Sequence, residues 1–311
     1  FGLHARGNFN GFREAGSSQK WLEVHMGDHI APFYDEEGRA LLKQFYDHFL
    51  KGEDNGWEKR SPVLLTIRRA DGTTTQREEN EWPLARTEWR KLYLDAASGA
   101  LVESAPQESA RISYQALEDA ALFTTPPLPK EVELTGPMAA KLYVSSSTPD
   151  MDIFATVQAF APDGTEVTFP GASEPAAPIA QGWLRVSHRK LDPENSRPWR
   201  PYHAHDEEQK LVPGQVYEVD VEIWPGQVVL PQGYTIGLRI EGKDFARPRP
   251  GVLGWIRDFI MDDVFRLNIR TGSGFFLHNH PDDRPKDLYG GDNAIHTGGK
   301  QLSHLLAPVV P

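Results

Sequence analysis

Hydrophobic and polar residues alternate with a period of two along much of the chain after residue 60. In the segment 219–223, Val219, Val221 and Ile223 alternate with acidic residues, and 235–241 has the same pattern. Such alternation is typical of strands in a sheet that buries one face. It predicts strands at 63–67, 91–94, 132–134, 140–145, 153–160, 183–189, 216–223, 234–241, 264–270 and 303–309.

Turn-forming residues separate the predicted strands, among them Pro-Asp-Gly at 162–164 and Pro-Gly at 213–214. Short strands without repeats and without alternating helices predict a mainly β fold, a two-sheet sandwich of the jelly-roll kind. From this pattern we expect residues 62–311 to fold independently. Long loops, which often carry function, are predicted at 170–181, 190–212, 243–261 and 278–300.

The first 52 residues follow a different pattern, that of the end of an α/β unit. Residues 20–26 predict a short strand and 27–32 a polar loop. A helix is predicted over 35–51, with Asp35 as its N-cap and Gly52 as its C-terminal stop. Its apolar stripe consists of Leu41, Leu42, Phe45 and Phe49. One strand and one helix cannot bury such a stripe, so we expect this segment not to fold alone.

Charge and composition exclude several classes of partner and site. The chain has 33 basic and 44 acidic side chains and a net charge of −11, which argues against a nucleic-acid or an anionic membrane partner. It contains no cysteine, so disulfides, thiolate metal sites and a cysteine nucleophile are excluded. The lack of disulfides suits the cytosol without excluding secretion. No apolar run approaches the roughly 20 residues that span a bilayer.

His29 is the candidate catalytic residue. It lies in the loop between the predicted strand and the predicted helix, where α/β-hydrolases place the general base of a Ser-His-Asp triad. The alternative is a structural loop histidine whose ring hydrogen-bonds to the backbone. His25 and His29 also have the HxxxH spacing that binds zinc on a helix, but Gly27 between them argues against a helix there.

Two further histidine pairs invite a metal interpretation, His203 with His205 and His278 with His280. Alternate residues of a strand face the same side, so a pair of this spacing can chelate a metal ion. Both pairs, however, lie in polar, proline-containing stretches, where capping and solvated histidines are commoner. We therefore expect no metal site and, without a dinucleotide or Walker A motif, no cofactor.

A serine nucleophile is missing from the chain. Gly-x-Ser-x-Gly does not occur, and Ser17, Ser18 and Ser273 lack the flanking glycines and the strand-to-helix context of a nucleophile elbow. No pair of carboxylates is placed for glycoside hydrolysis either. On the residues alone, a binding module is slightly favoured over an enzyme.

Several strings together point to one family. The chain resembles the C-terminal part of the cocaine-esterase / X-prolyl dipeptidyl-peptidase-like serine hydrolases, over nearly all of its 311 residues. The strings that carry the resemblance are KWLEVH at 20–25, FYDHFLKG at 45–52, EWPLA at 81–85, LYLD at 92–95, LTGP at 134–137 before Ser145 and Ser146, GWLRVSHR at 182–189 and IHTGG at 295–299.

The resemblance implies two parts. Residues 1–52 look like the incomplete C-terminal end of an α/β-hydrolase catalytic domain. Residues 60–311 look like a non-catalytic, galactose-binding-like jelly roll that packs against the core and helps to wall the active site. In this family the catalytic histidine follows the last strand of the core, which matches His29, with His25 as the alternative. The nucleophilic serine, the oxyanion donors and the triad aspartate would all precede residue 1.

The resemblance also implies a function for the longer parent protein. It would hydrolyse ester or amide bonds of small molecules or peptides, X-Pro dipeptidyl bonds among them, without a cofactor. The chain alone would be inactive, and its partner would be the missing α/β-hydrolase core. The alternative is a free-standing jelly-roll module that binds a carbohydrate or a protein. The oligomeric state is left open.

Overall fold

The computed structural model of the chain describes residues 4–27, 29–172, 176–247 and 278–311. Its helices are α1 (Ala5–Glu14), α2 (Ala31–Tyr34), α3 (Glu36–Lys51) and α5 (Lys286–Tyr289), with 3₁₀ turns η1 (Trp57–Lys59) and η2 (Val186–His188). Its strands are β1 (Leu22–Glu23), β2 (Val63–Arg69), β3 (Thr74–Glu79), β4 (Glu88–Asp95), β5 (Ala100–Val102), β6 (Ala110–Gln115), β7 (Ala120–Thr124), β8 (Val132–Ser146), β9 (Asp152–Phe160), β10 (Ala180–Arg185), β11 (Tyr217–Leu230), β12 (Thr235–Glu241), β13 (Asp292–Thr297) and β14 (His304–Val310).

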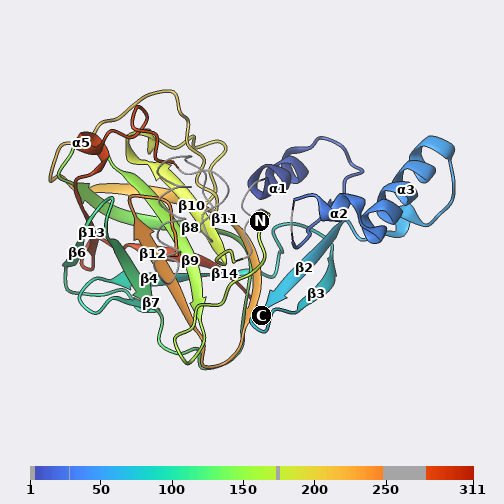
Figure 1. The fold of residues 1–311 in the computed structure, drawn as a ribbon, viewed down its shortest axis with the longest axis horizontal. Coiled ribbons are helices and arrows are strands. Elements are labelled where there is room, and N and C mark those ends of the chain that lie inside the picture. Colours follow the sequence, from blue (N-terminus) through green and yellow to red (C-terminus); the bar gives the residue numbers. More distant parts are fainter. Residues whose placement is uncertain (1–3, 28, 173–175, 248–277) are drawn as a thin grey trace, which may run out of the picture.

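The elements are arranged in two regions (Figure 1). Most strands form one body, and α1, α2 and α3 lie to one side of it, with the β2–β3 hairpin below them. Within the described residues the strands make a single hydrogen-bonded sheet of 14 strands. The path runs from β11 through β10, β9, β12, β7, β5, β4 and β14 to β8, and β8 pairs back with β11. The sandwich is therefore closed like a barrel, and the predicted mainly β fold is confirmed.

The longest pairing joins β8 and β11 and corrects one sequence prediction. The sequence predicts separate strands at 132–134 and 140–145, yet β8 runs through both and includes Gly136 and Pro137. Its partners absorb the irregularity, since the register shifts between Ile223 and Gly226 of β11 and between Leu306 and Val309 of β14. Such bulges bend a strand without ending it.

Other elements differ from the predicted ones for identifiable reasons. The helix α1 was not predicted, because its glycines and the absence of a side-chain cap hide the apolar spacing of Ala5, Phe9 and Phe12. The strand β13 falls inside the predicted loop 278–300, because Asn293 and Thr297 are buried polar residues that break the alternation. The strand predicted at 183–189 becomes β10 and then η2. The strand predicted at 264–270 lies outside the described residues.

Two hydrophobic cores hold the described residues together. The larger one fills the sandwich and includes Leu94, Phe123, Leu142, Ile153, Ile223 and Leu305. The smaller one joins the N-terminal segment to the β2–β3 region, because Phe9 of α1 stacks on Trp82 with ring centroids 4.5 Å apart. In addition, β1 pairs in parallel with β2, Leu22 opposite Val63. Within the first 52 residues, α1 and β1 are thus packed directly against the β2–β3 region of the sandwich.

Gly182 is required where β10 passes close to β11. A Cβ atom at this position would lie 2.0 Å from the carbonyl oxygen of Glu222, and β11 cannot retreat because β8 pairs with its other edge. We expect Gly182→Ala to lower the free energy of unfolding by about 1–3 kcal/mol, measured by urea denaturation. Gly16→Ala is the control, because nothing lies within 4 Å of its Cβ position. Equal stability of both variants would contradict this packing.

Candidate active site

His29 lies where the sequence predicts it, in the loop between β1 and α2. Its backbone N–H donates a hydrogen bond to the carbonyl oxygen of Ala172 in the sandwich, at 3.0 Å. Its ring lies 4.9 Å from the ring of His4, centroid to centroid, at an interplanar angle of 53°. The side chain is exposed. An exposed imidazole at a strand-to-helix loop is free to face a reacting group, which a buried core histidine is not.

His25, the alternative base, lines the same cavity as His29. This cavity of about 320 Å³ is also lined by His4, Phe33 and Ala172. Among the described residues Glu23 is the acidic side chain on its wall, and its carboxylate is paired with the guanidinium of Arg60 at 3.0 Å. The structure therefore brings the two candidate histidines together without a free carboxylate for either within the described residues.

The helix predicted over 35–51 is α3, and it has the predicted ends. Asp35 accepts a hydrogen bond from the backbone N–H of Gly38 at 2.7 Å, and Gly52 ends the helix with φ at 71°. The apolar stripe packs in part on two tryptophans, since the Phe45 ring lies 5.1 Å from that of Trp57, and the Trp21 ring lies 5.4 Å from the same ring.

The outer faces of α2 and α3 remain apolar and open to solvent. Phe33 is 56% exposed, Tyr34 73% and Leu50 76%. A groove of about 810 Å³ beside them is lined by Phe12, Trp21, Leu41, Phe45, Phe49 and Trp57, among other residues. Exposed apolar patches of this kind are typical of surfaces that contact another protein or domain.

We expect the isolated 311-residue chain to bind a hydrophobic dye and to self-associate at high concentration through this apolar surface. Leu50→Glu combined with Phe33→Ser removes two of its most exposed side chains and should lower both dye fluorescence and sedimentation coefficient. Leu122→Ser, on the exposed side of β7, is the control and should change neither. A strictly monomeric chain without dye binding would contradict this expectation.

The other histidine pairs have separate surroundings. His203 donates from Nε2 to the carbonyl oxygen of Asp220 at 3.1 Å, and burial lowers the pKa of its imidazole. Its ring lies 6.1 Å from that of His205, which in turn lies 5.5 Å from that of His188. Over the described ranges, no three histidine, aspartate or glutamate side chains are arranged to hold a metal ion.

His278 and His280 point to different partners. Nδ1 of His278 lies 2.8 Å from Oδ1 of Asp244, and its backbone N–H donates to Oδ2 of the same carboxylate at 2.7 Å. That hydrogen bond raises the pKa of the His278 imidazole. His280 has a side chain 62% exposed, and its Nδ1 accepts a long hydrogen bond, 3.3 Å, from the backbone N–H of Asp282. The pair does not converge on one point.

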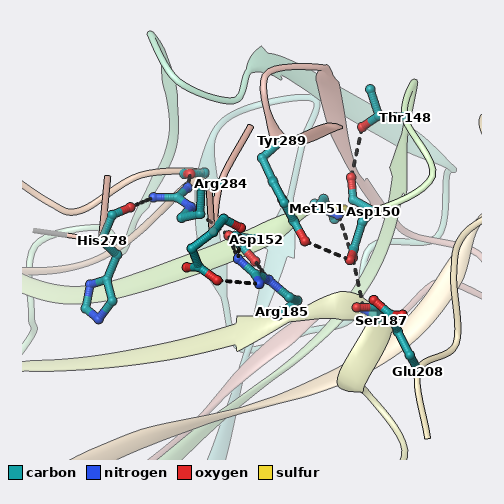
Figure 2. Close-up of polar contacts among 12 residues, drawn as sticks. Thr148, Asp150, Met151, Asp152, Arg185, Ser187, Glu208, His278, Arg284 and Tyr289 are labelled. Atoms are coloured by element: carbon teal, nitrogen blue, oxygen red, sulfur yellow. Dashed lines mark hydrogen bonds and ion pairs between the residues drawn. The ribbon is translucent and has the colours of Figure 1, made fainter. Parts of the chain in front are cut away.

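A buried charge network in the sandwich was not predicted from the sequence. Figure 2 shows Asp152 of β9 between the guanidinium groups of Arg185 and Arg284. Its carboxylate oxygens lie 3.0 Å from Nε of Arg185 and 2.8 Å from Nε of Arg284. The hydrogen bonds to Asp152 are the main reason that the pKa of Arg185 is raised. Since 132 residues separate Asp152 from Arg284, no local pattern could reveal the pair.

Asp150 organises the neighbouring turn (Figure 2). Its carboxylate accepts hydrogen bonds from the backbone N–H groups of Met151 and Ser187 and from the hydroxyl of Tyr289, at 2.9, 3.0 and 3.2 Å. Burial raises the pKa of the Tyr289 hydroxyl. These contacts hold the turn before β9 against η2 and α5.

Comparison with known proteins decides the family. The family described as the X-Pro dipeptidyl-peptidase C-terminal non-catalytic domain matches residues 55–251, well over half of the chain. The chain belongs to this family. The resemblance drawn from the sequence strings is therefore confirmed, and the matched residues include the strands from β2 to β12. Among the described residues, no helix has the length and hydrophobicity needed to cross a membrane.

The relatives of this chain are longer proteins. A putative Xaa-Pro dipeptidyl-peptidase of Rhodopirellula baltica is 24% identical over 74% of this chain and 36% of that protein. The cocaine esterase of a Rhodococcus species is 21% identical over 88% of this chain and 46% of its own length. The crystal structure of a CocE/NonD family hydrolase from Staphylococcus aureus is 31% identical, with a TM-score of 0.85 over 99% of this chain and 52% of that one. The chain thus spans about half or less of each relative.

Proposed function

We propose that the chain is the C-terminal part of a serine hydrolase that cleaves ester or amide bonds, X-Pro dipeptidyl bonds among them, and that His29 is its general base. The observation that carries this proposal is the exposed His29 imidazole in the loop after β1, beside the sandwich. The names of the relatives, a dipeptidyl-peptidase, an esterase and a hydrolase, support the reaction class.

In the proposed reaction a serine from the part of the protein that precedes residue 1 attacks the carbonyl carbon of the substrate. His29 accepts the serine proton, and the carbonyl oxygen becomes an oxyanion that fixed hydrogen-bond donors stabilise. The protonated imidazole then gives the proton to the leaving alcohol or amine. Water hydrolyses the acyl-enzyme by the same steps, and an upstream aspartate orients the imidazole.

In this proposal the sandwich and the helices α2 and α3 have different roles. The carbonyl of Ala172 in the sandwich accepts a hydrogen bond from the backbone of His29. In the proposed full-length protein, the upstream core covers the apolar outer face of α2 and α3, which is exposed in this chain. The chain itself would lack the nucleophile and the acid. Loss of a triad partner lowers the rate by several orders of magnitude, so we expect this chain alone to be inactive.

Labelling of the full-length protein with a fluorophosphonate probe tests this function, because the probe reports a reactive serine. We expect rapid labelling of the full-length protein, hydrolysis of a p-nitrophenyl ester or an X-Pro p-nitroanilide, and no labelling of residues 1–311. The His29→Ala variant of the full-length protein should label far more slowly. A full-length protein that neither labels nor hydrolyses either substrate would refute the proposal and favour a binding module.

A further inference from the structure

Among the described residues, His4 is the one whose aromatic ring lies beside the ring of His29. The two rings come from different elements, His4 from the residue before α1 and His29 from the loop after β1, and their centroids are 4.9 Å apart. Both side chains line the cavity of about 320 Å³ described above. This contact has no part in the proton transfers proposed for His29.

His4 is the residue just before α1, but its side chain does not cap the helix. Residues before a helix are most often Ser, Thr, Asp or Asn, because their side chains accept hydrogen bonds from the first backbone N–H groups. His4 makes no such side-chain bond, although its carbonyl oxygen accepts from the N–H of Asn8 at 3.1 Å. The helix forms without help from this ring, which is directed to His29 instead.

The helix that carries His4 is firmly attached to the sandwich. Arg6 forms an ion pair with Glu222 of β11 at 2.7 Å, and Arg200 donates to the side-chain oxygen of Asn10 at 2.9 Å. Phe9, 6% exposed, belongs to the smaller core. The backbone of His4 is therefore held by a helix that is attached to the sandwich, while its ring, like that of His29, is exposed.

We propose that His4 is a positioning residue for the candidate base, and this inference rests on the proposed function. The Ala172 carbonyl holds the backbone of His29, and the His4 ring limits the rotamers of its imidazole. An exposed side chain otherwise samples several rotamers. Since a reacting group must be held in a productive geometry, and a shift of about 1 Å can lower the rate by about 100-fold, restriction of the ring raises kcat.

The test compares His4→Ala and His4→Phe in the full-length protein. His4→Ala removes the ring and is expected to lower kcat by about tenfold, with KM changed by less than about twofold. His4→Phe keeps a flat ring of similar size and should restore most of kcat. His280→Ala, an exposed histidine in the distant loop before α5, is the matched control and should leave kcat unchanged. Melting temperatures of all variants check that each is folded.

The outcomes separate this inference from the proposed function. If His4→Ala keeps full kcat while His29→Ala is inactive, the proposed function stands and the role of His4 is wrong. If His4→Phe loses as much kcat as His4→Ala, ring packing is not what holds His29, and the inference also fails. If His29→Ala keeps full kcat, it is the proposed function that fails.

Discussion

Replacement of His29 by alanine in the full-length protein is expected to lower kcat by roughly three orders of magnitude or more. The imidazole would be the group that takes the proton from the serine, and alanine has no substitute for it. Because the side chain is exposed, the free energy of unfolding should change little. Steady-state kinetics with an ester substrate, together with urea denaturation, measures both quantities.

His25→Ala is the matched control for this prediction. His25 is the second residue after β1. It lines the same cavity as His29, and its side chain is likewise exposed. Its replacement should lower activity far less. The reverse result would make His25 the base and would move the catalytic position to the end of the strand. Full activity of both variants would remove the histidine loop from the mechanism.

Asp152→Ala should lower the free energy of unfolding by about 3–5 kcal/mol, the usual effect of removing one partner from a buried ion pair. The carboxylate is 8% exposed and serves two guanidinium groups at once, and the side chain of Arg284 is only 5% exposed. In the variant, the positive charge of the Arg284 guanidinium would remain buried after losing the carboxylate that balances it. Urea denaturation of the variant measures the change.

Asp283→Ala provides the comparison, because Asp283 pairs with the same Arg185 at 3.2 Å but is 63% exposed. An exposed ion pair contributes at most about 1 kcal/mol, so this variant should unfold nearly like the parent. Equal effects of the two substitutions would mean that the interior around Asp152 is hydrated and that the network contributes little to stability.

Elements that depend on neighbouring residues could be predicted from the sequence. The helix α3 is an example: Asp35 caps its first turn and Gly52 ends it in the left-handed region, and both effects act within a few residues. The alternation in β11 and β12 also survives, because burial of one face imposes it strand by strand. The same local argument places His29 in a strand-to-helix loop, although its catalytic role stays a prediction.

Local patterns are weaker where glycine or buried polar residues interrupt the period. Gly7 and Gly11 lower the helical propensity of α1, and its stability comes from Phe9, which packs on Trp82. In β13 the buried side chain of Asn293 takes an inward position that alternation assigns to apolar residues. Both elements exist because tertiary contacts outweigh propensity.

The sequence by itself determined the strand-rich composition of the chain, the histidine loop and the family strings, all of which depend on neighbouring residues. Only the tertiary structure decided that β8 closes the sheet onto β11, that Asp152 meets Arg284, and that His4 and Ala172 both reach His29. These contacts join residues far apart in the chain. Their energies depend on how whole elements pack, and no pattern of adjacent residues contains that information.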